Sequence, residues 1–308
     1  MKKIILFGSI ALAVSALVFV SCKQNEAQQE TVAETMTSGN LSIQVDNTIQ
    51  PIVEDVAAVF QSNYPKAKLT QVNRNEADIV RALLNNSATV AVLTRKLTPG
   101  EEGNFKQKGI KARTVAFAKD GIAFVASKSL KDTILNLQDI YKVLKGEDVP
   151  SVKQLIFDNA ASSTTRYLFD KAGVTNVPEK KVYTLKNTAE VLTFVKNNPG
   201  SIGVIGVNWL VQPSDELEPL ISQVQVLAVN NVKNGVPEKN YYKPSQSNIG
   251  AGLYPLTRTL YVLNYQGREG LGMGFANYIT NPDGQRIVLK SGLLPEKIPF
   301  REIEIVNK

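Results

Sequence analysis

Residues 41–62 read LSIQVDNTIQPIVEDVAAVFQS and contain the pattern from which the fold is inferred. Leu41 to Val45 is a short β-rich run, a polar turn follows it, and Pro51 to Ser62 carries apolar side chains near helical spacing. Proline suits the first position of a helix, where its missing N–H is not needed. The stretch therefore predicts a strand, a turn and a helix in succession.

The same alternation continues along the chain. Further strands are expected at Thr89–Leu93, Gly121–Ser127, Ser201–Gly206, Val224–Val229 and Thr259–Tyr265, and further amphipathic helices at Glu76–Asn85 and Ala189–Asn197. Strands that alternate with helices are typical of an α/β protein with largely parallel sheets. The apolar stripes indicate a hydrophobic core. The polar segment Asn230–Gly252 predicts a long surface loop or connector.

The composition excludes several classes of protein. The chain has 308 residues, 43% of them hydrophobic, which is enough for one large or two ordinary domains. It has no histidine and one cysteine, so Ser-His-Asp, Cys-His and His-zinc chemistry are excluded. The net charge of +7 falls to +5 without Lys2 and Lys3 (33 minus 28). This excess is spread without a basic run, so we expect no nucleic-acid partner, although small anions would be attracted.

The N-terminus has the features of a secretory signal. Met1-Lys2-Lys3 precedes the apolar run Ile4 to Val20, and Ser21-Cys22 follows it. The end of this segment resembles a bacterial lipobox, which implies removal of residues 1–21 and lipid attachment at Cys22. The alternative is an uncleaved membrane anchor. Residues 22–40 are polar and are expected to form a flexible tether, so we expect an exported protein, lipid-anchored to a bacterial membrane on the periplasmic side or cell surface.

Three turns carry hydroxyl groups immediately before a helix. Asn47, Thr48 and Ile49 lie in the first, where free N–H groups beside a threonine could bind an anion or simply cap the helix. Thr94 and Arg95 follow a strand, at the edge where open α/β sheets place ligands, although Arg95 could equally be an ordinary surface cation. Thr98 and Glu101, just beyond, predict a capping box.

The third turn begins at Asp158 and opens a helix that is expected to end near Ala172 and Gly173. It contains four consecutive hydroxyl residues followed by an arginine: Ser162, Ser163, Thr164, Thr165 and Arg166. Because one capping side chain satisfies only one or two N–H groups, the additional hydroxyls suggest a ligand with several oxygen atoms. A polar surface turn is the alternative.

Asp120 lies between Lys119 and Gly121 at the start of an apolar strand. It is either an ordinary turn residue or, beside a bound anion, an acceptor for a proton that the ligand carries. The sequence lacks the G-x-S-x-G, S-x-x-K, P-loop and Rossmann fingerprints. Together with the absence of histidine, this argues against a hydrolase, and we expect no enzymatic activity, cofactor or metal.

Several segments together resemble the phosphate-binding subunit of bacterial phosphate ABC importers in its lipoprotein form. The segments are Asp46–Pro51, Thr94–Leu97, Asp120–Ala123, Ser162–Thr164, Asn198–Gly203, Tyr254–Tyr261, and Asp283–Gln285 with Gly292. The resemblance implies a type II periplasmic binding protein fold, with two α/β lobes joined by a hinge. Lobe I would comprise residues 41–120 plus 250–308, and lobe II residues 121–249.

The resemblance also implies the partners and the site. A monomer would capture inorganic phosphate between its lobes and present it to an ABC permease in the cytoplasmic membrane. Thr48, the Ile49 N–H and Thr94 would bind from one lobe, Ser162, Ser163 and Thr164 from the other, and Asp120 would accept a ligand proton. Asn47, Arg95 and Arg166 complete the expected ligand-binding set.

Two residues depart from the family pattern. Asp158 stands where the family usually has an arginine, and Ser163 replaces a glycine. Because a carboxylate repels a bound anion, either Asp158 points away or another cation such as Arg166 or Arg95 compensates. Alternative functions are a binding protein for sulfate or a molybdate-like anion, and a surface lipoprotein used in adhesion or signalling. A carboxylate-dependent enzyme would require paired acids in the cleft.

Overall fold

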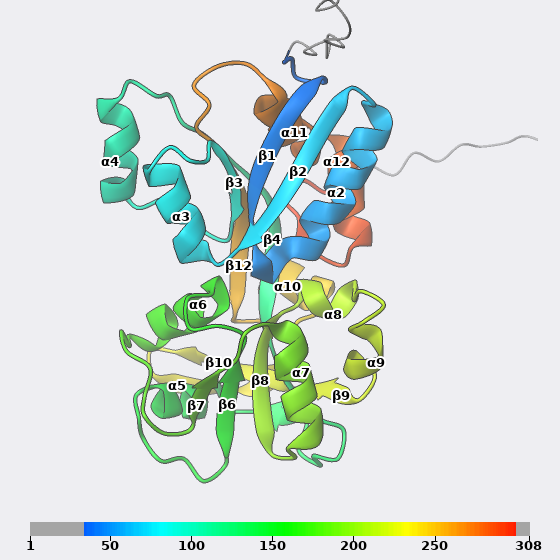
Figure 1. The fold of residues 1–308 in the computed structure, drawn as a ribbon. Helices are drawn as coiled ribbons and strands as arrows, with labels where there is room; N and C mark the ends of the chain where they lie inside the picture. Colours follow the sequence, from blue (N-terminus) through cyan, green and yellow to red (C-terminus); the bar gives the residue numbers. More distant parts are fainter. Residues whose placement is uncertain (1–33, 300–308) are drawn as a thin grey trace, which may run out of the picture. The chain divides into compact units, whose positions relative to one another are not determined.

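The computed structural model describes residues 34–299, and these build two α/β lobes (Figure 1). The expected fold class is confirmed. The first lobe contains β1 (Gly39–Asp46), the short 3-10 helix η1 (Asn47–Ile49), α2 (Gln50–Asn63), β2 (Ala67–Arg74), α3 (Glu76–Leu84), β3 (Val90–Leu93), α4 (Pro99–Gln107), α11 (Leu271–Thr280), α12 (Pro282–Lys290) and β13 (Leu294–Pro295).

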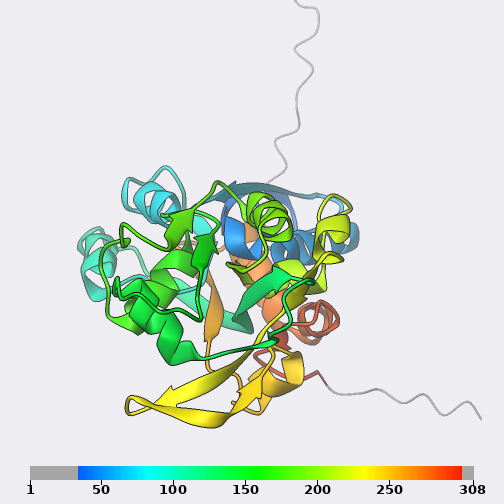
Figure 2. The ribbon, with the colours of Figure 1, turned by 90° about the horizontal axis from the view of Figure 1, so that it is seen from below.

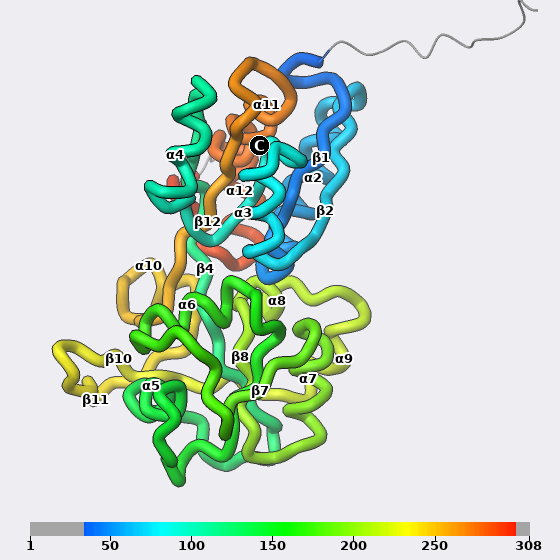
Figure 3. Tube along the Cα trace, turned by 60° about the vertical axis from the view of Figure 1, so that its left-hand side comes forward, coloured from blue at the N-terminus to red at the C-terminus, as the bar shows by residue number. Residues whose placement is uncertain are grey.

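The second lobe is built from the middle of the chain. It contains β5 (Ile134–Leu135), α5 (Leu137–Leu144), β6 (Gln154–Phe157), α6 (Ser163–Ala172), β7 (Val182–Thr184), α7 (Thr188–Asn197), β8 (Ser201–Gly206), α8 (Asn208–Val211), α9 (Glu218–Ile221), β9 (Val224–Val226), β10 (Ala228–Lys233), β11 (Val236–Tyr242) and α10 (Gln246–Gly250). In the tube view, α6 and α8 lie on the side of the second lobe that faces the first lobe (Figure 3).

Two strands connect the lobes. β4 (Arg113–Ser127) pairs with strands of the first lobe through its beginning and with β8 and β9 through its end, and β12 (Thr257–Asn264) runs antiparallel beside it. The main sheet has the order β2-β1-β3-β12-β4-β8-β6-β7. β1 is parallel to β2 and β3, and β6 is parallel to β7 and β8. Parallel pairs therefore form the outer part of each lobe and antiparallel pairs the centre.

The hydrophobic cores follow this division. The clusters of the first lobe, which include Phe60 and Phe275, draw on residues 41–118 and 260–293. Those of the second, which include Phe157 and Leu192, draw on residues 122–256. Asp120 lies between the two ranges, on β4, which pairs with strands of both lobes. Each lobe thus has its own apolar interior, and the polar groups between them are not part of either core.

The prediction of a long surface loop or connector at Asn230–Gly252 is wrong for most of that segment. β10 and β11 form a hairpin there, and α10 follows it. Lys233 pairs with Val236, so Asn234 and Gly235 form a two-residue turn, with φ angles of 50° and 77°. Asn-Gly favours this turn because both residues tolerate positive φ, although the surrounding polar composition concealed the strands. The hairpin projects from the body in Figure 2.

Most other expected elements agree with the structure to within a few residues. β8 has the expected bounds, and the predicted helix Pro51–Ser62 is α2. The predicted strand Val224–Val229 divides into β9 and β10. Gly173 ends α6 in the left-handed conformation, with φ 69°, and Thr98 and Glu101 form the predicted capping box of α4.

The predicted signal segment and Cys22 lie outside the described residues. β1 begins at Gly39, two residues before the expected start of the first lobe, and Glu34 already bonds Gln266 and the N–H of Leu271. Within residues 34–299 the structure contains no helix that is long and apolar enough to cross a membrane.

Candidate functional site

Asp120 and Arg258 form a buried ion pair at the junction of the lobes. They are directly opposite each other on β4 and β12. Nε and Nη2 of Arg258 lie 3.0 and 2.8 Å from Asp120 Oδ2, and the side chains are 2% and 0% exposed. Burial raises the pKa of Asp120, and the guanidinium opposes that shift. The register of two central strands thus places a fixed cation between the lobes.

The turn after β1 contributes Thr48 from the first lobe. Asp46 caps this turn by accepting the N–H of Thr48 at 2.9 Å. The Thr48 hydroxyl is therefore not needed as a cap, and it lies 3.0 Å from Arg258 Nη2. Ile49 is fully buried in the core, and Asn47 donates to Asn75 Oδ1 at 3.4 Å. Of the three expected residues in this turn, the Thr48 hydroxyl is the one that contacts the buried cation.

The start of α6 contributes Ser163 from the second lobe. Its hydroxyl lies 2.9 Å from Arg258 Nη1 and 2.8 Å from the hydroxyl of Thr48. Ser162 is the N-cap: it accepts from the Thr165 N–H at 3.2 Å and donates to Asp158 Oδ1 at 2.6 Å. The buried Thr164 hydroxyl has no partner among the described residues. The consecutive hydroxyls therefore divide between capping the helix and facing the other lobe.

Thr94, Arg95 and Arg166 converge on a residue that the sequence analysis missed. Glu76 Oε1 accepts from Arg95 Nε at 2.8 Å and from Arg166 Nε at 2.6 Å, while the Thr94 hydroxyl donates to Glu76 Oε2 at 3.2 Å. Arg95 also bonds both carboxylate oxygens of Glu101. Because Arg166 belongs to the second lobe and Glu76 to the first, this cluster is an ionic link between the lobes. The two expected compensating cations are thus already paired with carboxylates.

Replacing Glu76 with glutamine should lower the free energy of unfolding by about 1–3 kcal/mol, because two arginines lose a charged acceptor in a mostly buried position. Urea denaturation measures this loss. The matched control is Asp78→Asn in the same helix, whose pair with Arg81 is exposed and should contribute less than about 0.5 kcal/mol. Equal effects of the two variants would contradict a structural role for the link.

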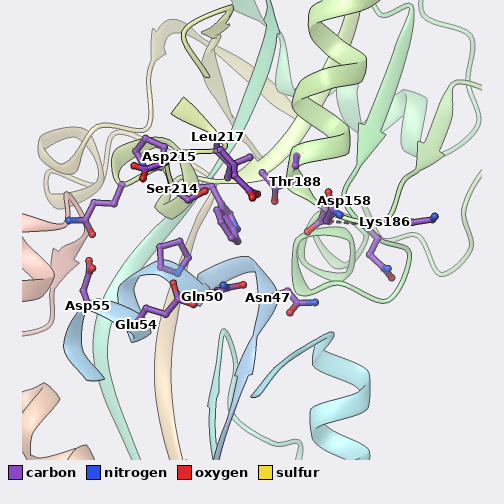
Figure 4. Close-up of a pocket in the computed structure, with 18 of the residues that line it drawn as sticks. Asn47, Gln50, Glu54, Asp55, Asp158, Lys186, Thr188, Ser214, Asp215 and Leu217 are labelled. Carbon is purple, nitrogen blue, oxygen red and sulfur yellow. Dashed lines mark hydrogen bonds between the residues drawn. The ribbon is translucent and has the colours of Figure 1, made fainter. Parts of the chain in front are cut away.

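A cleft of about 880 Å³ lies beside these residues and is shown in Figure 4. It is lined from the first lobe by Asn47, Gln50, Glu54 and Asp55, and from the second by Asp158, Lys186, Thr188, Trp209, Asp215 and Glu216, among others. The cleft shares Asn47 and Asp158 with the turns described above. Its wall carries more carboxylates than cations, so a ligand that passes through it meets a predominantly acidic surface.

The sequence analysis missed two other residues in the centre of the site. Arg258 was part of a quoted segment but was not recognised as a buried cation between the lobes, although an arginine amid the alternating apolar residues of a strand was a usable signal. Asp46 is fully buried, and its Oδ2 has no partner among the described residues. Burial raises the pKa of Asp46 despite the nearby Arg258.

Comparison with known proteins supports this description of the fold. Residues 30–283 match the model of a PBP superfamily domain. A Borreliella burgdorferi protein named "Phosphate-binding protein PstS" is 23% identical over 311 residues, covering 96% of this chain and 99% of that protein. A Pseudomonas aeruginosa protein with the same name is 23% identical, covering 84% and 83%.

Solved structures show the same fold at low sequence identity. A putative phosphate ABC transporter substrate-binding protein from Clostridium perfringens, with bound phosphate, has a TM-score of 0.65 at 19% identity, covering 84% of this chain and all of that one. The OxyR2 regulatory domain of Vibrio vulnificus reaches 0.51 at 13% identity, covering 79% and 98%. Because regulators and binding proteins share the fold, function has to be argued from the site. The length of the family match establishes that the chain belongs to the PBP superfamily.

Proposed function

We propose that this protein is a solute-binding protein that captures inorganic phosphate between its lobes without converting it chemically. The observation that carries the proposal is the convergence of Thr48, Ser163 and Asp120 on Arg258. These groups come from both lobes and from both connecting strands. Relatives of nearly full length are named as phosphate-binding proteins, and one structural neighbour contains phosphate.

The donors suit a small oxyanion. In the described structure the buried Thr48 and Ser163 hydroxyls bond each other directly between the lobes. A phosphate between them would accept a hydrogen bond from each hydroxyl, so one direct contact is exchanged for two contacts to the ligand. The unpartnered Thr164 hydroxyl and the N–H groups at the start of α6 add further donors. Arg258 supplies the positive charge that Arg95 and Arg166 were expected to supply.

Asp120 favours phosphate over a fully ionised anion. A buried carboxylate beside the ligand is tolerated when it accepts a proton that the ligand carries. Sulfate has no such proton at neutral pH, so it would leave two negative groups in contact. We therefore expect sulfate and molybdate-like anions to bind more weakly than phosphate.

The boundaries of the two lobes and the location of the protein in the cell are also part of the proposal. The core clusters support lobes close to residues 41–120 plus 250–308 and 121–249, although the second core extends to Leu256. Export through residues 1–21, a lipid on Cys22 and delivery of phosphate to an ABC permease complete the proposed role. Labelling of the wild-type protein, but not of Cys22→Ser, with a radioactive fatty acid would support the anchor.

Calorimetric titration of the purified full-length protein, dialysed free of phosphate, tests the proposed function. We expect saturable heat with phosphate and no competition from equimolar sulfate. Trp209, the single tryptophan of the chain, lines the cleft, so its fluorescence should change in parallel. Absence of saturable heat from folded protein would refute phosphate binding, and competition by sulfate would favour the second ligand class.

A further inference from the structure

The centre of the site contains more buried carboxyl groups than cations. Asp46, Asp120 and Asp158 are 0%, 0% and 5% exposed, and the buried guanidinium among them is that of Arg258. Arg258 directs both Nε and Nη2 to Asp120. Asp46 and Asp158 therefore remain without an ion-pair partner among the described residues. Adding a phosphate anion to this arrangement increases an existing excess of negative charge.

Asp158 is the carboxyl group through which this excess can be relieved. Both of its hydrogen bonds reach Oδ1, from the Ser162 hydroxyl at 2.6 Å and from the Asn159 N–H at 2.9 Å. Oδ2 receives no hydrogen bond from the described residues, and the side chain lines the 880 Å³ cleft. Asp158 is thus held in place by one oxygen while the other remains available to a ligand or a proton.

The charged groups around Asp158 come from several elements. Asp46 at the end of β1 repels its ionised form, and Arg258 on β12 partly offsets this repulsion. Lys186, before α7, is exposed at the cleft wall, while Glu54, Asp55, Asp215 and Glu216 line the same cleft. Glu76 on α3 is paired with Arg95 and Arg166. The surroundings of Asp158 are therefore acidic on balance.

We propose that Asp158 couples phosphate capture to the uptake of a proton, which is held between the Asp158 carboxyl and a ligand oxygen in the complex. This proposal rests on the proposed function. An ionised Asp158 and a phosphate oxygen would repel each other, whereas a shared proton makes the same contact a hydrogen bond. No bond other than those to the proton changes. Asp158 is in this way a specificity residue for the protonated ligand, in the place where the resemblance implied an arginine.

The direction of the pH dependence follows from linkage. Burial, together with Asp46, raises the pKa of Asp158 to about 6 in the ligand-free protein. An approaching anion raises it further, so binding takes up a proton at pH values above about 6 and below the higher pKa of the complex. Over that window, one coupled proton weakens affinity by up to about tenfold per pH unit as pH rises. Below about pH 5 the carboxyl is already protonated, and the coupling disappears.

Calorimetry in buffers of different ionisation enthalpy measures the number of protons taken up when phosphate binds. At about pH 7 the wild-type protein should take up close to one proton more than Asp158→Asn, since the ligand's own titration is common to both and cancels. Asparagine retains an oxygen that can accept from Ser162. Asp215→Asn, an exposed change on the same cleft, is the matched control and should behave as the wild type.

The possible outcomes are distinct. Binding with equal proton uptake in the wild type and Asp158→Asn overturns the coupling while leaving phosphate binding established. Absence of phosphate binding at every pH overturns both proposals. Loss of uptake in Asp215→Asn as well would assign the effect to general cleft charge and overturn the role of Asp158. If Asp158→Asn does not fold, carbon-13 NMR of the aspartate carboxyl groups in the wild-type protein replaces the comparison. One carboxyl group should titrate near pH 6 and become protonated when phosphate is added. Failure to observe such a group would contradict the coupling.

Discussion

Replacing Arg258 with methionine is expected to weaken phosphate binding strongly and to destabilise the folded protein. The substitution keeps an apolar stem but removes the cation that contacts Thr48, Ser163 and Asp120. Truncating one partner of a buried charged pair costs about 2–5 kcal/mol, which in binding corresponds to roughly a 30-fold to several-thousand-fold loss of affinity. The free energy of unfolding should fall by about 3–5 kcal/mol, because Asp120 is left buried and unpaired. Calorimetry and urea denaturation measure the two effects.

The double variant Asp120→Asn with Arg258→Met separates these effects. It contains neither buried charge, so most of the lost stability should return. Affinity should not return, because the ligand still lacks its cation. A double variant as unstable as Arg258→Met would show that packing of the guanidinium, rather than the unpaired Asp120, causes the loss of stability.

Replacing Gly206 with alanine should have the second largest effect on binding. A Cβ atom there would lie 2.9 Å from Arg258 Nη2 and 3.0 Å from the carbonyl oxygen of Thr48. Both atoms are fixed, one by an ion pair and one by the backbone, so the turn and the cation have to move apart. We expect about 1–3 kcal/mol of destabilisation and a roughly tenfold or larger loss of phosphate affinity.

Gly203→Ala is the matched control on the same strand. Its Cβ would meet side-chain methyl groups of Val191, Val125 and Val195 at 2.8 to 3.0 Å, within the core of the second lobe. Comparable destabilisation is expected, but affinity should stay close to that of the wild type. If both variants lose affinity equally, overpacking of β8 rather than displacement of Arg258 is responsible.

The sequence predicted the parts of the site that are local. A hydroxyl turn after a strand or before a helix is visible in a few consecutive residues, and Thr48 and Ser163 were found in this way. What they contact could not be found locally, since Arg258 is 138 residues from Asp120 and meets it through the register of β4 and β12. Glu76 has the appearance of an ordinary acidic residue in a first helical turn.

The expectation for Arg95 and Arg166 shows the same limit. Both lie next to the expected ligand-binding turns, and both are positively charged. Proximity in sequence does not reveal which carboxylate a long side chain will reach, and the two arginines meet Glu76. The turn at Asn234 and Gly235 could have been predicted from the sequence, because Asn-Gly between two strand-forming segments indicates a hairpin even where the surroundings are polar.

The continuity of β4 determines the order in which the site would assemble. Because this strand pairs with strands of both lobes, a swing of one lobe against the other would have its pivot near Asp120, where displacement is smallest. The Asp120 carboxylate and Arg258 on the adjacent strand would remain together if the lobes opened, whereas Thr48 and Ser163, which belong to different lobes, would separate. An incoming anion would therefore contact the preassembled Arg258–Asp120 pair first. The hydroxyls of Thr48 and Ser163 would reach the anion afterwards, when the lobes close around it.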